Sequence, residues 1–212
     1  MDSTLHQLGL KHGTDKATYH GYCDFYQEHL PTKIESLLEI GVMDGASLRM
    51  WAEYYPDAAI YGVENHDGRA TSAKVNGAAI LHGDATDPEF IRDVIIPLGP
   101  FDVIIDDGSH MTKDQQDSLF HLMASVVPGG VYVVEDLHTS FMSNYVNSNI
   151  STVGMLQAWS EDAHNFPEVT WFARTQGDPK AFVSRHGFDP MALDWTGGPE
   201  AKSITAIIRT EP

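Results

Sequence analysis

The stretch "VIIDDGSHMT" (Val103–Thr112) passes from an apolar, β-branched run into two adjacent carboxylates and then reaches a histidine. The same arrangement recurs in "VYVVEDLHTS" (131–140). Short apolar runs of this kind are typical of strands buried in a parallel sheet. Because neighbouring carboxylates repel one another and are costly to desolvate, their position at the ends of two hydrophobic strands requires a physical reason.

Apolar runs alternate with stretches of helical length throughout the chain, which predicts βαβ units and a mainly parallel sheet. The expected strands are 36–42, 59–65, 78–84, 101–107 and 131–136, followed by an antiparallel pair at 168–173 and 203–210. The expected helices are 46–55, 67–75, 87–96 and 112–126, with a "PGG" turn (128–130) before the fifth strand. We therefore expect an α/β fold with a doubly wound sheet.

Two segments, 1–34 and 140–165, lie outside this alternation of strands and helices. Residues 1–34 are expected to be helical, and Tyr19, Tyr22, Phe25 and Tyr26 lie near helical spacing, which favours packing over function. Residues 140–165 begin polar and then become helical, so we expect them to line the mouth of an active site on the substrate side. A single domain covering 1–212 accounts for the length.

Charge and cysteine content limit the partners and the compartment. The formal net charge is −17 and no basic stretch is present, which argues against binding to nucleic acid or to an anionic membrane surface. The single cysteine, Cys23, excludes an internal disulfide and fits a reducing cytosol. No secretory leader is visible, and no run approaches the roughly 20 apolar residues of a membrane span. We expect a cytoplasmic protein.

The first strand-to-helix turn, "LEIGVMDGASL" (38–48), reads E-x-G-x-x-x-G. In doubly wound sheets, ligands bind beyond the carboxyl ends of the strands. Gly41 and Gly45 would let the backbone approach such a ligand, although an ordinary βα turn explains this stretch equally well. A nicotinamide fingerprint needs a third glycine, and Asp44 would repel a pyrophosphate, which weakens a dehydrogenase interpretation.

Two further acids close the next strands. Glu64 is placed to accept hydrogen bonds from both hydroxyls of a ribose, and Asp84 in "GDATD" (83–87) to receive an adenine amino group. This combination resembles the S-adenosylmethionine-dependent methyltransferases of the doubly wound class. By that resemblance, the acid of the first motif, Glu39, lies near the methionine end, and Asp84 with Ala85 borders the adenine. An acidic pocket suits the sulfonium and ammonium of this cofactor.

If the fourth and fifth strands are neighbours, they lie about 4.8 Å apart, and Asp107 converges with Glu135 and Asp136. A hard divalent cation with oxygen ligands, such as Mg²⁺, would compensate these charges, and Mn²⁺ or Co²⁺ could substitute in vitro. His110 follows Asp107 by three residues and is a fitting general base. The alternative is that the acids cap helices and that the histidine packs on the surface.

Together, "GTDKATYHGY" (13–22), "EIGVMDGAS", "IIDDGSH" and "VVEDLH" resemble the metal-dependent sugar O-methyltransferases of macrolide and related glycoside pathways, over roughly residues 8–140. The resemblance implies a class I (Rossmann-like) seven-stranded sheet whose last strand is antiparallel. It implies Asp107, Glu135 and Asp136 as Mg²⁺ ligands, His110 as base, and an N-terminal lid (1–34) whose "GTDK" turn closes over the cofactor. The implied cofactor contacts are Thr14, Lys16, Glu39, Gly41, Asp44, Ser47, Glu64, Asp84, Ala85 and Asp106.

The acceptor and the assembly stay open at this stage. The compact chain is more similar to mycobacterial enzymes that methylate mannose oligosaccharides during methylmannose polysaccharide synthesis than to macrolide enzymes, which have a large N-terminal domain. Either a monomer or a homo-oligomer is compatible with the sequence. The candidates for sugar contact are Tyr19, His20, His138, Thr139 and Asn144, and His138 could equally be a loop histidine near the site.

We therefore expect an S-adenosylmethionine- and Mg²⁺-dependent O-methyltransferase that acts on a hydroxyl of a small saccharide or glycoside. A metal-dependent methyltransferase of a catechol-like phenol is the nearest competing interpretation. Such enzymes commonly use a lysine base, and Lys113 is the closest lysine to the acidic pairs. An NAD-dependent oxidoreductase and a non-enzymatic sugar- or metal-binding module are weaker candidates. The module would require the metal site without the cofactor motifs.

Overall fold

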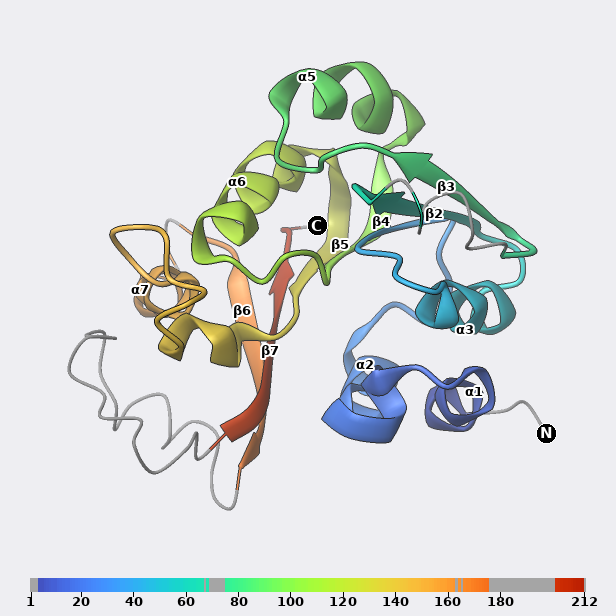
Figure 1. Ribbon diagram of the computed structural model, residues 1–212, viewed down its shortest axis with the longest axis horizontal. Coiled ribbons are helices and arrows are strands. Elements are labelled where there is room, and N and C mark those ends of the chain that lie inside the picture. The colour runs from blue at the N-terminus through green and yellow to red at the C-terminus, as the bar shows by residue number, and fades with distance from the viewer. Residues whose placement is uncertain are drawn as a thin grey trace.

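The computed structural model of the protein describes residues 4–66, 68, 75–162, 164, 166–175 and 201–211. Seven strands form one sheet in the order β3-β2-β1-β4-β5-β7-β6 (Figure 1). The strands are β1 (Ser36–Ile40), β2 (Ala59–Glu64), β3 (Ala78–His82), β4 (Phe101–Asp106), β5 (Val126–Val134), β6 (Glu168–Thr175) and β7 (Ala201–Arg209). This is the fold that the sequence predicts.

The pairing of the strands confirms the doubly wound arrangement. Strands β1 to β5 are mutually parallel, and β7 runs antiparallel to both β5 and β6. The strand order reverses at β1, which pairs with β2 on one side and with β4 on the other. In open α/β sheets, such a reversal marks the place where ligands bind.

Helices cover both faces of the sheet (Figure 1). One face is covered by α1 (Leu5–His12), a π-helical turn η1 (Lys16–His20), α2 (Tyr22–His29) and α3 (Ala46–Tyr54). The other face carries α5 (Pro88–Phe90), η2 (Ile91–Ile95), η3 (Ile96–Leu98), α6 (Thr112–Leu122), η4 (Met123–Ser125), η5 (Leu137–Phe141) and α7 (Thr152–Glu161). Among the described residues, no helix combines the length and apolar character needed to span a membrane.

The N-terminal segment belongs to the core of the first face. Helix α1 begins with a capping box between Thr4 and Gln7. Tyr22 and Tyr26 are fully buried in the cluster that β1, β4 and β5 contribute to this face. The expectation that the aromatic residues pack is therefore confirmed for Tyr22, Phe25 and Tyr26, and it is wrong for Tyr19, which is 59% exposed.

Two predicted elements differ clearly from the observed ones, the fifth strand and the helix expected at 87–96. Strand β5 starts at Val126 rather than after the "PGG" turn, because Val126 pairs with Phe101 before a register shift carries the strand past the glycines. The helix expected at 87–96 is divided into α5, η2 and η3, of which η2 is a π-helical turn. The helix expected at 67–75 lies outside the described residues, apart from Gly68 and Val75.

Candidate active site

A cavity of about 580 Å³ opens at the carboxyl ends of the parallel strands, where the strand order reverses. Its walls come from the loops that follow β1, β2, β3 and β4, from Gly13–Asp15, and from Asp136 after β5. The backbone aligns these loops, because Asp107 N donates to Ile40 O (2.9 Å) and Glu135 N donates to Asp106 O (2.9 Å). A volume of this size is typical of small-molecule sites in proteins.

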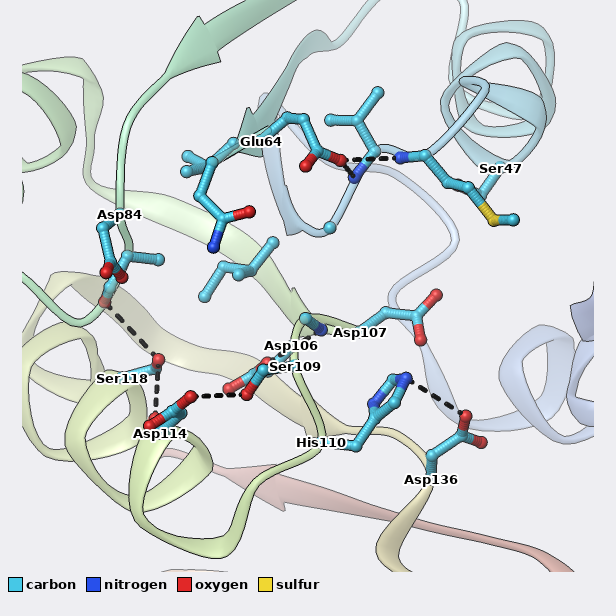
Figure 2. A pocket seen from close by; sticks show the side chains of 18 of the residues that line it. Ser47, Glu64, Asp84, Asp106, Asp107, Ser109, His110, Asp114, Ser118 and Asp136 are labelled. Carbon is cyan, nitrogen blue, oxygen red and sulfur yellow. Dashed lines mark hydrogen bonds and ion pairs between the residues drawn. The ribbon is translucent and has the colours of Figure 1, made fainter. Parts of the chain in front are cut away.

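The loop after β1 is fixed by its glycine and by Glu64. Gly41 has φ +90, and a Cβ at this position would lie 2.1 Å from Asp107 O, so only glycine lets the two loops pass. The buried Glu64 carboxylate accepts hydrogen bonds from Val42 N (3.2 Å) and Met43 N (2.9 Å) through Oε2. Its Oε1 accepts a bond from His66 N at 2.9 Å. Glu64 therefore holds the turn in place while facing the cavity (Figure 2).

Most of the expected cofactor contacts line this cavity. They are Thr14, Gly41, Asp44, Ser47, Glu64, Asp84, Ala85 and Asp106. Asp84 uses Oδ1 to accept bonds from Thr86 N (2.8 Å) and Thr86 Oγ1 (2.7 Å), which orders the turn after β3. Burial raises the pKa of Asp106 to about 7, so this carboxyl is easily neutralised beside its charged neighbours.

Lys16 and Glu39 differ from expectation, because both are buried behind the cavity wall. The Lys16 ammonium lies 3.2 Å from Glu39 Oε1, 2.5 Å from Asp107 Oδ2 and 3.0 Å from Glu135 Oε2. Burial opposes its charge, but the surrounding carboxylates outweigh burial and hold the pKa of Lys16 well above its usual value. Lys16 is thus an internal cation that pairs with carboxylates on or next to three strands.

Asp107, His110 and Asp136 form a cluster whose ligand atoms lie within 4.8 Å of one another. Figure 2 shows His110 pointing toward Asp136, and His110 Nε2 is 3.6 Å from Asp136 Oδ2. Both residues have left-handed backbone conformations, with φ values of 61 and 52. Such conformations are costly for residues other than glycine, and they gather at functional sites.

The charge of Asp136 is stabilised by its surroundings. Burial acts to raise the pKa of Asp136, but three neighbouring histidines and the Tyr22 hydroxyl outweigh burial and lower it. An ionised carboxylate beside Asp107 offers the oxygen ligands that Mg²⁺ or Mn²⁺ prefers, and the His110 imidazole lies next to them. In the described part of the chain, the buried atoms Glu135 Oε1 and His110 Nδ1 have no hydrogen-bond partner. The residues present therefore fit a divalent cation.

Glu135, the third expected ligand, lies outside this three-residue cluster. Its Oε2 accepts a hydrogen bond from Lys16 Nζ, and the carboxylate is buried. Lys16 contacts Asp107 at least as closely as it contacts Glu135, so this ion pair does not remove Glu135 from the ligand set, and its role as a ligand stays a prediction.

None of the five expected sugar contacts is among the described residues that line the cavity. Thr139 is buried and its Oγ1 donates to backbone carbonyls, with Asp136 O at 2.7 Å, so it offers no free hydroxyl. His20 is also buried, with Nδ1 2.8 Å from Ser203 Oγ, and His138 is largely buried beside Asp136. Tyr19 and Asn144 are exposed.

The sequence analysis missed one wall of the cavity, which is formed by Ser109, Asp114 and Ser118 (Figure 2). Ser109 Oγ donates to Asp114 Oδ2 at 2.6 Å, and Ser118 Oγ donates to Asp114 O at 2.9 Å. Asp114 and Ser118 are four residues apart on α6 and therefore share one helix face. The sequence could have indicated this wall, because Asp114 and Ser118 share a helix face and closely follow the loop that carries His110.

Comparison with known proteins agrees with this fold. Residues 38–137 match the family model described as a methyltransferase domain. The chain thus contains a methyltransferase domain, built on the class I methyltransferase fold. The MycE methyltransferase from the mycinamycin biosynthetic pathway, solved with Mg, SAH and mycinamycin VI, has the same fold, with a TM-score of 0.72 and 23% identity. That alignment covers 99% of this chain and 55% of the MycE chain.

The curated relatives that this chain resembles include sugar O-methyltransferases. The 8-demethyl-8-alpha-L-rhamnosyl tetracenomycin-C 2'-O-methyltransferase of Streptomyces olivaceus is 34% identical over 173 residues, which are 74% of this chain and 45% of the relative. The L-olivosyl-oleandolide 3-O-methyltransferase of Streptomyces antibioticus is 36% identical over 152 residues, which are 66% of this chain and 39% of the relative. This chain therefore spans less than half the length of these curated relatives.

Proposed function

We propose that this chain transfers a methyl group from S-adenosylmethionine to a sugar hydroxyl of a glycosylated small molecule, with the help of a divalent cation. The observation that carries the proposal is the shared cavity. Glu64 and Asp84 line one part of it, and Asp107, His110 and Asp136 line another. A cofactor in the first part would present its methyl group to an acceptor in the second. The named relatives, which methylate rhamnosyl and olivosyl groups, support a sugar as acceptor.

The residues for the cofactor are suitably placed. The Glu64 carboxylate has about four acceptor sites and three of them hold backbone amides, so one site is left for a ribose hydroxyl in this conformation. Asp84 and Ala85 border the space for the adenine, with Ser118 behind them. The carboxylates along the cavity favour the positive sulfonium and ammonium groups of this cofactor.

Asp107 and Asp136 would hold the cation, and Mg²⁺ at this position would polarise the acceptor hydroxyl. His110 accepts the proton of that hydroxyl as the oxygen attacks the methyl carbon and the sulfonium leaves as a neutral thioether. The proton then resides on the imidazole, whose positive charge is stabilised by Asp136 at 3.6 Å. A positioned base of this kind contributes about 10²–10⁴-fold to the rate.

The experiment that tests the proposal is calorimetric titration with S-adenosylmethionine, with and without Mg²⁺. Methyl-transfer assays on rhamnosides, olivosides, mannosides and catechols follow. We expect cofactor binding and Mg²⁺-dependent transfer to a sugar. Absence of cofactor binding would exclude the proposal, and transfer to catechols alone would favour a phenol as acceptor. The mannosides test the narrower prediction of a polysaccharide-methylating enzyme of the mycobacterial type.

A further inference from the structure

The carboxylates of the candidate cation site are contacted by side chains from the N-terminal segment. Tyr22 Oη donates to Asp136 Oδ1 at 2.8 Å, and Lys16 Nζ donates to Asp107 Oδ2 at 2.5 Å. Both residues precede the region that matches the methyltransferase family model, which begins at residue 38. The region that matches the family model thus supplies the acids, and the N-terminal segment before it contacts two of them.

The orientation of Tyr22 is fixed by packing. The ring is fully buried, stacks on His20 with centroids 5.0 Å apart, and meets Phe172 edge-on at 5.7 Å. The Tyr22 hydroxyl donates to Asp136 Oδ1 at 2.8 Å and also lies 3.3 Å from Ile204 O, so hydrogen bonding as well as packing fixes its position. One oxygen of Asp136 is thereby held by Tyr22, and the other faces His110.

Lys16 acts on Asp107 in the same way. Its ammonium holds Oδ2, while the Asp107 side chain keeps a fifth of its surface exposed and lines the cavity. Glu39 and Glu135 hold the ammonium from the other side, so Lys16 cannot turn toward solvent without leaving two buried carboxylates uncompensated.

We propose that Tyr22 and Lys16 are positioning residues of the cation site: Tyr22 orients Asp136 and Lys16 orients Asp107, so that both ligands are arranged before a cation binds. This inference rests on the cation binding proposed above. Groups that orient metal ligands typically contribute 10–100-fold to metal affinity. The N-terminal segment would then be part of the metal centre, although it supplies none of its proposed ligands.

The test uses the whole chain and Tyr22→Phe, which removes only the hydroxyl. The matched control is Tyr55→Phe, because Tyr55 is also buried and its hydroxyl donates at 2.8 Å to Pro31 O, which is not part of the cluster. Mn²⁺ affinity is measured by electron paramagnetic resonance, together with Tm and S-adenosylmethionine affinity. We expect Tyr22→Phe to weaken Mn²⁺ binding by about 10–100-fold. Tyr55→Phe should lower Tm similarly and leave Mn²⁺ affinity within about twofold of wild type.

Lys16→Met and Lys16→Arg extend the test. The methionine variant should lose Mn²⁺ affinity to at least the same extent, and arginine should restore part of it because it keeps the charge. Wild-type affinity in Tyr22→Phe, or an equal loss in Tyr55→Phe, would overturn the inference while leaving the proposed function intact. Absence of Mn²⁺ binding by the wild-type protein would overturn both, because the cation itself would then be missing.

Discussion

Replacing Gly41 by alanine tests the closest backbone contact in the candidate site. The added Cβ would lie 2.1 Å from Asp107 O and 2.8 Å from Asp107 C, whereas real Cβ atoms essentially never come within 3.0 Å of another heavy atom. Both obstacles are backbone atoms, so no side-chain rotation can relieve the contact. The loop after β1 must move away from the loop after β4, which carries a proposed ligand.

Gly129 provides a matched control, since its φ is +77 and a Cβ there would meet nothing within 4 Å. An L residue in a left-handed conformation lowers the free energy of unfolding by about 1–2 kcal/mol. Replacing glycine also restricts the unfolded chain, which raises the free energy of unfolding by about 0.4–1 kcal/mol. Gly129→Ala should therefore lower the free energy of unfolding by about 1 kcal/mol. In Gly41→Ala, steric crowding should lower the free energy of unfolding by about a further 1–3 kcal/mol. The two variants should therefore differ by about 2 kcal/mol in unfolding free energy, or about 4–8 °C in Tm.

The assay is urea unfolding of both variants, accompanied by calorimetric titration with S-adenosylmethionine. We expect Gly41→Ala to be the less stable variant and to lose cofactor affinity, because the displaced turn carries the amides that Glu64 holds. Gly129→Ala should keep wild-type cofactor affinity. Equal unfolding free energies for the two variants would refute the close approach of the loops.

Three further predictions concern single side chains. His110→Ala should lower the turnover rate by about 10²–10⁴-fold and leave S-adenosylmethionine affinity unchanged; a large loss of that affinity by calorimetry would contradict its role as base. Glu64→Ala should weaken cofactor binding by about tenfold or more, because hydrogen bonds to charged groups are lost, and unchanged affinity would count against ribose recognition. Cys23 is fully buried and burial raises its thiol pKa to about 12, so Ellman's reagent should react with it only after urea unfolding. Rapid reaction of the native protein would show that the packing of α2 is wrong.

The sheet was predictable because its strands carry an unambiguous pattern. The runs that end at Asp106 and Val134 are apolar on both faces, as expected of central parallel strands covered by helices. The start of β5 was not predictable, because "PGG" has the composition of a turn and only the pairing of Val126 with Phe101 reveals that the strand has already begun. The local amino-acid composition does not show that Val126 pairs with β4.

The acids of the site were also predictable, since strand ends fix where Asp107 and Asp136 emerge. The role of Lys16 was not, because its three partners lie 23, 91 and 119 residues away in the sequence. A lysine in a glycine-containing turn favours an exposed position on average. Only the folded arrangement shows that it is the counter-charge of two buried carboxylates, Glu39 and Glu135, and of the partly exposed Asp107.

The paired carboxylates have a physical explanation in the alternation of side chains along a strand. Successive residues point to opposite faces, so Asp107 does not share the surroundings of Asp106. Asp106 lies on the face of Tyr132, where burial raises its pKa to about 7 and its charge is easily lost. Asp107 lies on the face of the N-terminal segment and is paired with Lys16. Asp106 and Asp107 are thus divided between two environments, which reduces the repulsion that the sequence alone implies for this pair.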